Sequence, residues 1–429
     1  MTTTDAPRVH RATWIAGLVL GVAIIGALVT AVAASWAEDS LLVPRHGGHP
    51  VGDPYWSWVF RWCLVGAFAA YAGAALLAAR QRLSLRVAIA FGVVIQLLPL
   101  AGPLILSTDA WTYWDYGRID VVHDANPYVQ TPAAFPDDPA YPHVGRRWVH
   151  TPSVYGPAFT MATAPIALVA GESSDAAAWL FKSLAALAMI AAMLGVGRIA
   201  RRPALATVVV GWSPLLAVQA GGAGHNDAWI AALAIGAIVA ARAGRPIVAG
   251  ATWAIAALVK WVPLLLVPSI ALAALARLRT NREELRVIIR ACVGFAIVAS
   301  ITIAIAFARY GDAWLDAFAP LMRNAQNPSG YSLTVRLELL GAPTLVARFL
   351  PYVLLGIAGL VVLLDALRGR TRSGLVMVAI VACSPLIAPW YLLWAVPLAT
   401  TDEDDTVPIV IAVVLSAALL LNGIPIRSH

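Results

Sequence analysis

Long apolar runs, separated by short turns that carry arginine, follow one another along this chain. Most runs reach about 18 residues, which as a helix is enough to cross the roughly 30 Å hydrocarbon core of a bilayer. The pattern predicts an all-α fold, a polytopic transmembrane helical bundle of about 13 spans. The expected spans are 13–36, 56–79, 87–106, 176–196, 204–220, a sixth ending at 242, a pair within 247–276, 287–307, 343–367, a pair within 374–399, and 407–421.

The arginines set the expected sidedness of these spans. The turn with Arg80, Arg82 and Arg86 should be cytoplasmic, because basic residues concentrate in the cytoplasmic loops of membrane proteins. The run 13–36 is too long for the apolar region of a usual signal peptide and no clear cleavage site follows, so we expect an uncleaved span. A multi-pass protein of the plasma membrane follows, with residues 107–157 on the extracytoplasmic side.

Three apolar segments fit this sidedness only as something other than single spans. A span over 154–170 would place the arginines at 198–202 outside, so an interfacial helix is expected there. Residues 247–276 and 374–399 must enter and leave on the cytoplasmic side, so each is expected to form two short helices. Lys260 then lies at the turn of the first pair.

Composition supports the membrane assignment and excludes one class of partner. The chain is 60% hydrophobic and 12% charged, against about 25% charged residues in soluble proteins. The net charge of +7 comes from arginines at the ends of spans, so it reflects sidedness rather than nucleic-acid binding. No domain boundary is evident, and residues 1–429 are expected to form one domain. Its large extracytoplasmic loop, 107–157, has no helical period, and its many Pro and aromatic residues favour an ordered cap.

Asp109 is the first candidate for chemistry. It stands where the third span leaves the membrane, among aromatic residues, where partial desolvation would raise its basicity and suit a general base. The Ser-Thr that precedes it also makes a good helix-capping sequence, so an acidic cap on an interfacial helix is an equal alternative. Asp115 and Asp120 are expected to be solvated or paired with Arg118.

The sequence Gly224-His225-Asn226-Asp227, at the outer end of the fifth span, is the second candidate. Glycine lets the backbone approach a ligand closely, and His225 can donate a hydrogen bond to a phosphate or a proton to a leaving oxygen. The alternative is a capping turn, in which Asn226 or Asp227 caps the next helix.

Lys182 and Lys260, the two lysines of the chain, are expected at the depth of the outer leaflet. A charge within the membrane is costly and therefore suggests function, here the binding of an anionic lipid phosphate. For Lys182, snorkelling of the ammonium to the interface is an equal alternative.

Aromatic and amide side chains of the outer loops offer stacking surfaces and hydrogen-bond partners to sugars, although a belt of interfacial aromatic residues is the competing interpretation for each one alone. The outer histidines show no helical ligand pair, so no metal site is expected. The candidate sugar- and acceptor-binding residues are Tyr113, Tyr128, Tyr155, Asn226, Asp227, Tyr331, Trp390 and Tyr391.

Taken in order, these motifs resemble a known family. The segment from Ser107 to Tyr113, together with Asn126-Pro-Tyr128 and Tyr155-Gly-Pro157, resembles the first large loop of the C-type (GT-C) glycosyltransferase superfamily. More narrowly, it resembles the actinobacterial polyprenol-phosphate-mannose-dependent α-(1→6)-mannosyltransferases. The segments around His225, Lys260 and Pro389-Trp390-Tyr391 are similar to theirs as well, so the similarity extends from about residue 87 to 400.

The resemblance implies an inverting transferase that moves a sugar, mannose, from a polyprenyl monophosphate to a lipid-linked or cell-envelope glycan on the extracytoplasmic face. Asp109 matches the position of the family's base, and His225, Lys260 and Arg323 would stabilise the leaving phosphate in place of a metal, without a cofactor. The alternative is a transporter or flippase of lipid-linked sugars. That class places ionisable residues near mid-membrane, whereas here they favour the outer end.

Overall fold

The computed structural model describes residues 6–44, 52–317, 319, 328–402 and 406–426. These residues form helices and turns, and their one β-type pairing is an isolated bridge between Ser40 and Asp53. The expected all-α class is therefore confirmed for the described part of the chain. Arg323, expected to bind phosphate, lies outside the described residues.

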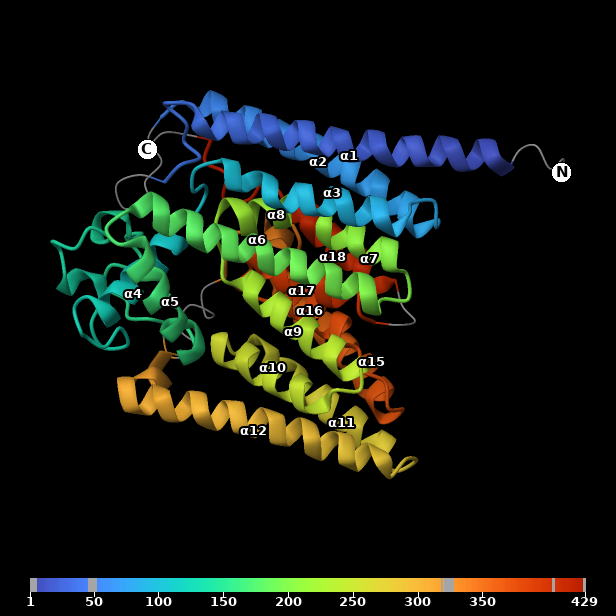
Figure 1. Ribbon diagram of the computed structural model, residues 1–429. Helices are drawn as coiled ribbons and strands as arrows, with labels where there is room; N and C mark the ends of the chain where they lie inside the picture. Colours follow the sequence, from blue (N-terminus) through green and yellow to red (C-terminus); the bar gives the residue numbers. More distant parts are fainter. Residues whose placement is uncertain (1–5, 45–51, 318, 320–327, 403–405, 427–429) are drawn as a thin grey trace.

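The helices form a bundle with two outer groups and a central group (Figure 1). One outer group contains α1 (Ala6–Trp36), α2 (Pro54–Ala79), α3 (Leu85–Leu97) and η2 (Leu98–Ala101). The other contains α10 (Pro246–Val259), η6 (Val262–Leu266), α11 (Val267–Leu278), α12 (Glu283–Tyr310) and α15 (Thr344–Leu367). Between them lie α6 (Ser174–Ile199), α7 (Pro203–Gly211), α8 (Pro214–Ala217), η5 (Val218–Gly222), α9 (Asp227–Arg242), α16 (Ser373–Cys383), α17 (Leu392–Ala399) and α18 (Val407–Leu419).

A cap covers one end of this bundle, with α4 and α5 side by side (Figure 1). It is built from α4 (Asp109–Val121), η3 (Pro132–Ala134), η4 (Tyr141–His143) and α5 (Pro157–Ala170). The remaining short helices are η7 (Ala313–Ala317), α14 (Leu333–Leu339) and η8 (Pro389–Tyr391).

Local chemistry explains where these helices begin. Proline occupies the first turn of α5, α7 and α10, where its missing N–H costs no helical hydrogen bond. Ser173 caps α6 by accepting a hydrogen bond from the N–H of Ala176, and Asp53 does the same for α2 through Tyr55. The start points of the helices are thus encoded locally.

In the part of the chain that the structure describes, five helices are long and apolar enough to cross a membrane, namely α1, α2, α6, α12 and α15. A sixth crossing results if the bent pair Pro203–Gly211 and Pro214–Gly222 is one span. The expected break at Lys260 is present, because α10 ends at Val259 and η6 begins at Val262. The break near Pro389 is present too, within η8. The total of thirteen spans stays a prediction.

The cap contains a helix that no periodic pattern marks. Residues 107–157 have no helical period, but α4 occupies Asp109–Val121. Every residue from Ala110 to Asp120 is buried, so this helix has no solvent face and hence no amphipathic period in its sequence. Gly117 lets α4 approach α5 closely, because a Cβ there would lie 2.5 Å from the carbonyl oxygen of Thr163.

Candidate active site

Helix α4 positions Asp109 at its first residue. The N–H of Asp109 donates to the hydroxyl of Ser107 (3.1 Å), and the indole of Trp111 donates to the carbonyl of Ser174 on α6 (2.9 Å). The Asp109 side chain is 15% exposed, in contrast to the fully buried residues that follow it. Asp109 thus lies in the first turn of α4, after the N-cap residue Thr108, and its carboxylate is accessible.

A tight backbone approach brings His225 to Asp109. Gly224 has φ +73°, a left-handed conformation that favours glycine, and a Cβ there would lie 3.2 Å from the Cβ of Ala110. His225 Nδ1 lies 3.2 Å from Asp109 Oδ2, and the imidazole stacks on the indole of Trp390 with ring centroids 4.5 Å apart. The glycine thus allows two loops far apart in sequence to form one site.

Asp227, Lys260 and Trp394 form a network beside this pair. The ammonium of Lys260 donates to both carboxylate oxygens of Asp227 (2.9 and 3.0 Å), and the indole of Trp394 donates to Oδ1 (2.9 Å). Lys260 also lies 5.7 Å from the ring centroid of Tyr391. One buried carboxylate therefore joins α9, the break after α10, and α17.

The capping alternative for this loop is not supported. Asn226 is the N-cap residue of α9, but its side chain makes no capping hydrogen bond. Its Oδ1 instead accepts from the hydroxyl of Tyr113 (3.4 Å), and its buried Nδ2 has no hydrogen-bond partner among the described residues. Tyr113 in turn packs edge-on against Tyr155 and Phe159. The amide of Asn226 is thus an available donor within an aromatic wall.

The charges around Asp109 and its burial have opposite effects on the pKa of this carboxyl. Burial alone would raise the pKa of this carboxyl, but contact with His225 and the positive charge of Lys260 outweigh it, and the pKa is lowered. The expected rise in basicity is therefore wrong, because contact with His225 and the charge of Lys260 offset the effect of burial. Asp109 is held ionised, in the form that accepts a proton.

Lys182 lies apart from this cluster. Its side chain is buried, and its ammonium donates to the carbonyl oxygens of Gly102 and Pro103 (3.0 Å for the latter), at the end of η2. The carbonyl end of a helical segment attracts cations. The ammonium is thus held by backbone carbonyl groups inside the bundle, where it fixes the segment that leads into Asp109.

Two of the expected sugar-binding tyrosines also serve the fold. The hydroxyl of Tyr128 donates to the carbonyl of Tyr155 (2.9 Å) and lies 2.9 Å from the hydroxyl of Thr160, which ties the cap to α5. The hydroxyl of Tyr331 accepts from the N–H of Gly423 (3.1 Å). Neither hydroxyl has a hydrogen bond to Asp109 or His225 among the described residues.

Asp115 and Asp120 also differ from expectation. Both are buried, and neither has a hydrogen bond to Arg118, which pairs with Asp138 instead (2.7 Å). Asp120 accepts hydrogen bonds from Arg309 (2.8 Å) and from the hydroxyl of Tyr310 (2.9 Å). Asp120 therefore ties the cap to the end of α12, where Arg309 and Tyr310 lie.

Trp394 is the functional candidate that the sequence reasoning missed. It stands four residues after Trp390 and three after Tyr391, a spacing that places side chains on one face of a helix. Once Tyr391 was a candidate, that spacing was the signal that could have found Trp394.

Among the described residues, no group of three or more His, Cys, Asp or Glu side chains could hold a metal ion.

Comparison with known proteins defines the class and then the family. A family model described as "Alpha-(1->6)-mannopyranosyltransferase, N-terminal domain" matches residues 12–276, more than half of the chain, and one described as "MptB C-terminal domain" matches residues 330–426. With its long apolar helices, the protein is a membrane glycosyltransferase that acts on mannose. The chain belongs to the alpha-(1->6)-mannopyranosyltransferase family, which confirms the resemblance seen in its motifs. No curated protein and no solved structure gives a significant match.

Proposed function

We propose that this protein transfers mannose, with inversion, from a polyprenyl monophosphate to a lipid-linked or cell-envelope glycan. One observation carries the proposal, the ionised and partly exposed carboxylate of Asp109 with His225 Nδ1 3.2 Å away and Trp390 stacked on that imidazole. It combines a carboxylate, an imidazole and an aromatic surface within one site.

The proposed reaction is a single displacement. The acceptor hydroxyl oxygen attacks the anomeric carbon of mannose as the bond from that carbon to the phosphate oxygen breaks. Asp109 takes the hydroxyl proton, and the polyprenyl phosphate leaves with the bonding electron pair. A β-linked donor then gives an α-linked product, in agreement with the α linkage in the family description.

Protein side chains stabilise the leaving phosphate in this proposal. His225 contacts Asp109, the charge of Lys260 acts on the same carboxylate, and the buried Nδ2 of Asn226 is an unused donor nearby. Preorganised donors of this kind stabilise developing negative charge strongly because they need no reorganisation. We propose that these groups act without a divalent metal or another cofactor.

The proposed site faces the extracytoplasmic side of the plasma membrane. The cap that carries Asp109 lies at one end of the bundle, and α9 ends at the opposite end with Arg242, Arg245 and their turn (Figure 1). Because arginines mark cytoplasmic turns, the cap end is outside. Thirteen crossings, with 107–157 as the large outer loop, remain our proposed topology.

A transfer assay with purified protein, polyprenyl-phosphate mannose and an α-(1→6)-mannoside acceptor tests the proposal, with EDTA present. Wild type should transfer mannose, and Asp109→Asn should lower kcat by at least about 100-fold because general-base catalysis is lost. The control Asp175→Asn removes an exposed carboxylate from the first turn of α6 and should retain activity.

This assay can contradict each component of the proposal separately. Normal turnover by a folded Asp109→Asn protein would remove Asp109 from the mechanism. A loss of wild-type activity with EDTA that Mg²⁺ or Mn²⁺ restores would show that a metal is needed. Mannose transfer from a nucleotide sugar but not from the polyprenyl phosphate would overturn the donor.

A further inference from the structure

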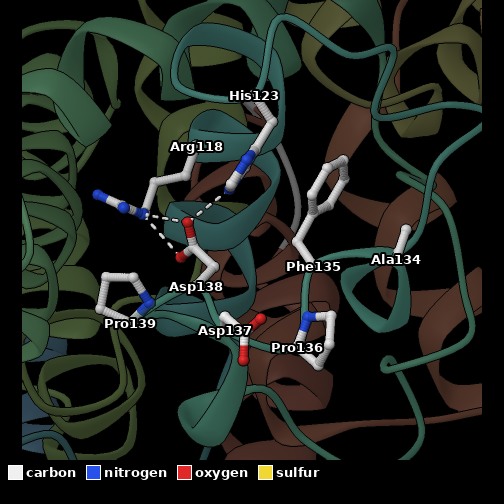
Figure 2. Close-up of a pocket in the computed structure, with 8 residues that line it drawn as sticks. All are labelled: Arg118, His123, Ala134, Phe135, Pro136, Asp137, Asp138 and Pro139. Carbon is white, nitrogen blue, oxygen red and sulfur yellow. Dashed lines mark hydrogen bonds and ion pairs between the residues drawn. The ribbon is translucent and has the colours of Figure 1, made fainter.

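A second pocket opens in the cap, away from Asp109. It has a volume of about 380 Å³ and is formed by residues 134–139 together with Arg118 and His123 (Figure 2). The segment 134–139 follows η3, and Arg118 lies on α4, so the pocket belongs to the same cap as Asp109. Neither family description nor any part of the proposed mechanism accounts for it.

A fixed carboxylate forms one wall of this pocket. Asp138 accepts hydrogen bonds from Arg118 Nε (2.7 Å) and from the N–H of Ala140 (2.9 Å), and lies 2.6 Å from His123 Nε2. Arg118 also donates to the carbonyl of Gly171 (2.7 Å). The cation is thus already paired and bonded, so the pocket offers no excess positive charge to a phosphate.

Apolar rings and an exposed carboxylate form the remaining walls of the pocket. The ring of Phe135 stacks on His123 with centroids 4.1 Å apart and an interplanar angle of 20°. Pro136 and Pro139 present their rings, and Asp137 is exposed between them (Figure 2). Flat apolar rings pack against the C–H faces of sugars, while carboxylates accept hydrogen bonds from hydroxyls. A neutral carbohydrate fits both features.

The distance to Asp109 limits how this pocket can serve the enzyme. Asp109 and Arg118 are nine positions apart on α4, about 13 Å along its axis, and nine steps of about 100° place them on opposite faces. A glycan that occupies both places must pass round the helix, over roughly 15–20 Å, which takes about four or more hexose units.

We propose that the pocket between Phe135, Asp137 and Arg118 is a carbohydrate-binding site that holds a distant part of a long glycan acceptor. This proposal rests on the proposed transfer function, because the glycan it names is the acceptor of that reaction. The pocket retains long acceptors, and short ones reach only the site at Asp109.

The test uses two acceptors, octyl α-(1→6)-mannosides of two and of eight mannose units. Asp137→Asn removes the exposed carboxylate, and Ala134→Trp fills the pocket with an indole from an exposed position. Both changes should raise KM for the eight-unit acceptor about 5-fold with kcat unchanged, because only binding is lost. KM for the two-unit acceptor should not change.

The matched control variants lie in the same cap but outside the pocket. Asp124→Asn and Gln130→Trp make the same chemical changes at exposed positions and should leave both acceptors unaffected. Equal KM values of wild type for the two acceptors, or equal effects of Ala134→Trp on both, would overturn the proposed site while leaving the transfer function intact.

A direct binding measurement separates the two proposals. Saturation-transfer NMR should detect the eight-unit mannoside on wild-type protein in nanodiscs and lose most of the signal with Ala134→Trp. If wild type transfers mannose to neither acceptor, the proposed function fails, and this measurement alone decides the site. An undiminished signal with Ala134→Trp would overturn it.

Discussion

At the scale of single residues, position rather than basicity would explain the proposed role of Asp109. Burial acts on its pKa in one direction, contact with His225 and the charge of Lys260 act in the other, and the pKa is lowered. A carboxylate of lowered pKa is a weaker base in water, so in the proposed mechanism its contribution comes from alignment with the acceptor hydroxyl. The sequence predicted Asp109, His225 and Lys260 from their places at the outer ends of apolar runs. It could not predict the carbonyl pair that binds Lys182, because backbone partners leave no trace in side-chain composition.

Asp115 is a buried carboxyl whose Oδ1 has no hydrogen-bond partner among the described residues. Burial, and then the negative charge of Asp138, raise its pKa to about 8, although Arg118 opposes the shift. The folded protein therefore holds a proton here that the unfolded chain releases above about pH 4. Stability should fall as pH rises from about 4 to 8, by up to about 1.4 kcal/mol per pH unit.

Asp115→Asn should remove this dependence, because the amide stays neutral. Thermal unfolding in detergent between pH 5 and 9 should show the variant gaining several °C over wild type at pH 9, with a smaller difference at pH 5. Asp175→Asn, at an exposed site, serves as the control. Parallel curves for wild type and Asp115→Asn would show that Asp115 is already ionised in the folded protein.

At the scale of helices, α10 and α12 meet through two glycines. A Cβ on Gly250 would lie 1.9 Å from the carbonyl oxygen of Ala291, and one on Gly294 would lie 2.0 Å from that of Ile247. Small residues of this kind let membrane helices pack at backbone contact. Because Lys260 directly follows α10, this crossing also sets the place of the ammonium beside Asp227.

Gly250→Ala should push α10 away from α12 and lower stability by about 1–3 kcal/mol, as overpacking does. Mannose transfer should fall too, because Lys260 moves with the end of α10. Gly356→Ala, in the middle of α15 with no atom within 4 Å of the added Cβ, should be neutral or stabilising. Thermal unfolding and the transfer assay measure both effects, and an unchanged melting temperature for Gly250→Ala would contradict the close crossing.

The helices divide into those that apolar runs predicted and those that they did not. Apolar runs ending at Pro or Arg predicted the bundle helices and the breaks at Lys260 and Pro389. The apolar pattern did not predict helix α4. The cap buries this helix on all sides, so its polar and apolar residues do not alternate with a helical period. Hydrophobic periodicity arises in a helix that has one face toward the core and another toward solvent or lipid, and α4 has no such exposed face.

At the scale of the whole molecule, sidedness is the property to test. Glu172 follows α5 in the cap and Ala243 follows α9 at the other end, and both are exposed. In a protein whose three native cysteines are replaced by alanine, Glu172→Cys should react with a membrane-impermeant maleimide on intact cells. Ala243→Cys should react only after permeabilisation. The reverse pattern would place the active site in the cytoplasm.

The two matched parts of the chain both contribute to the site. Asp109, His225 and Asp227 lie in the part that ends at 276, and Trp390 and Trp394 lie in the part that begins at 330. Asp227 is bound by Lys260 from the first part and by Trp394 from the second. The site is therefore a product of the complete fold rather than of either part alone.

This division has a consequence for biosynthesis. A chain is inserted into the membrane from its N-terminus, so Asp227 and Lys260 enter the bilayer while the codons for Trp390 and Trp394 are still untranslated. Until then, the imidazole of His225 lacks its stacking partner and the carboxylate of Asp227 lacks its indole donor. The ribosome has therefore made nine-tenths of the protein before Trp390 is present, and a prematurely terminated product that ends earlier lacks both indoles of the candidate site.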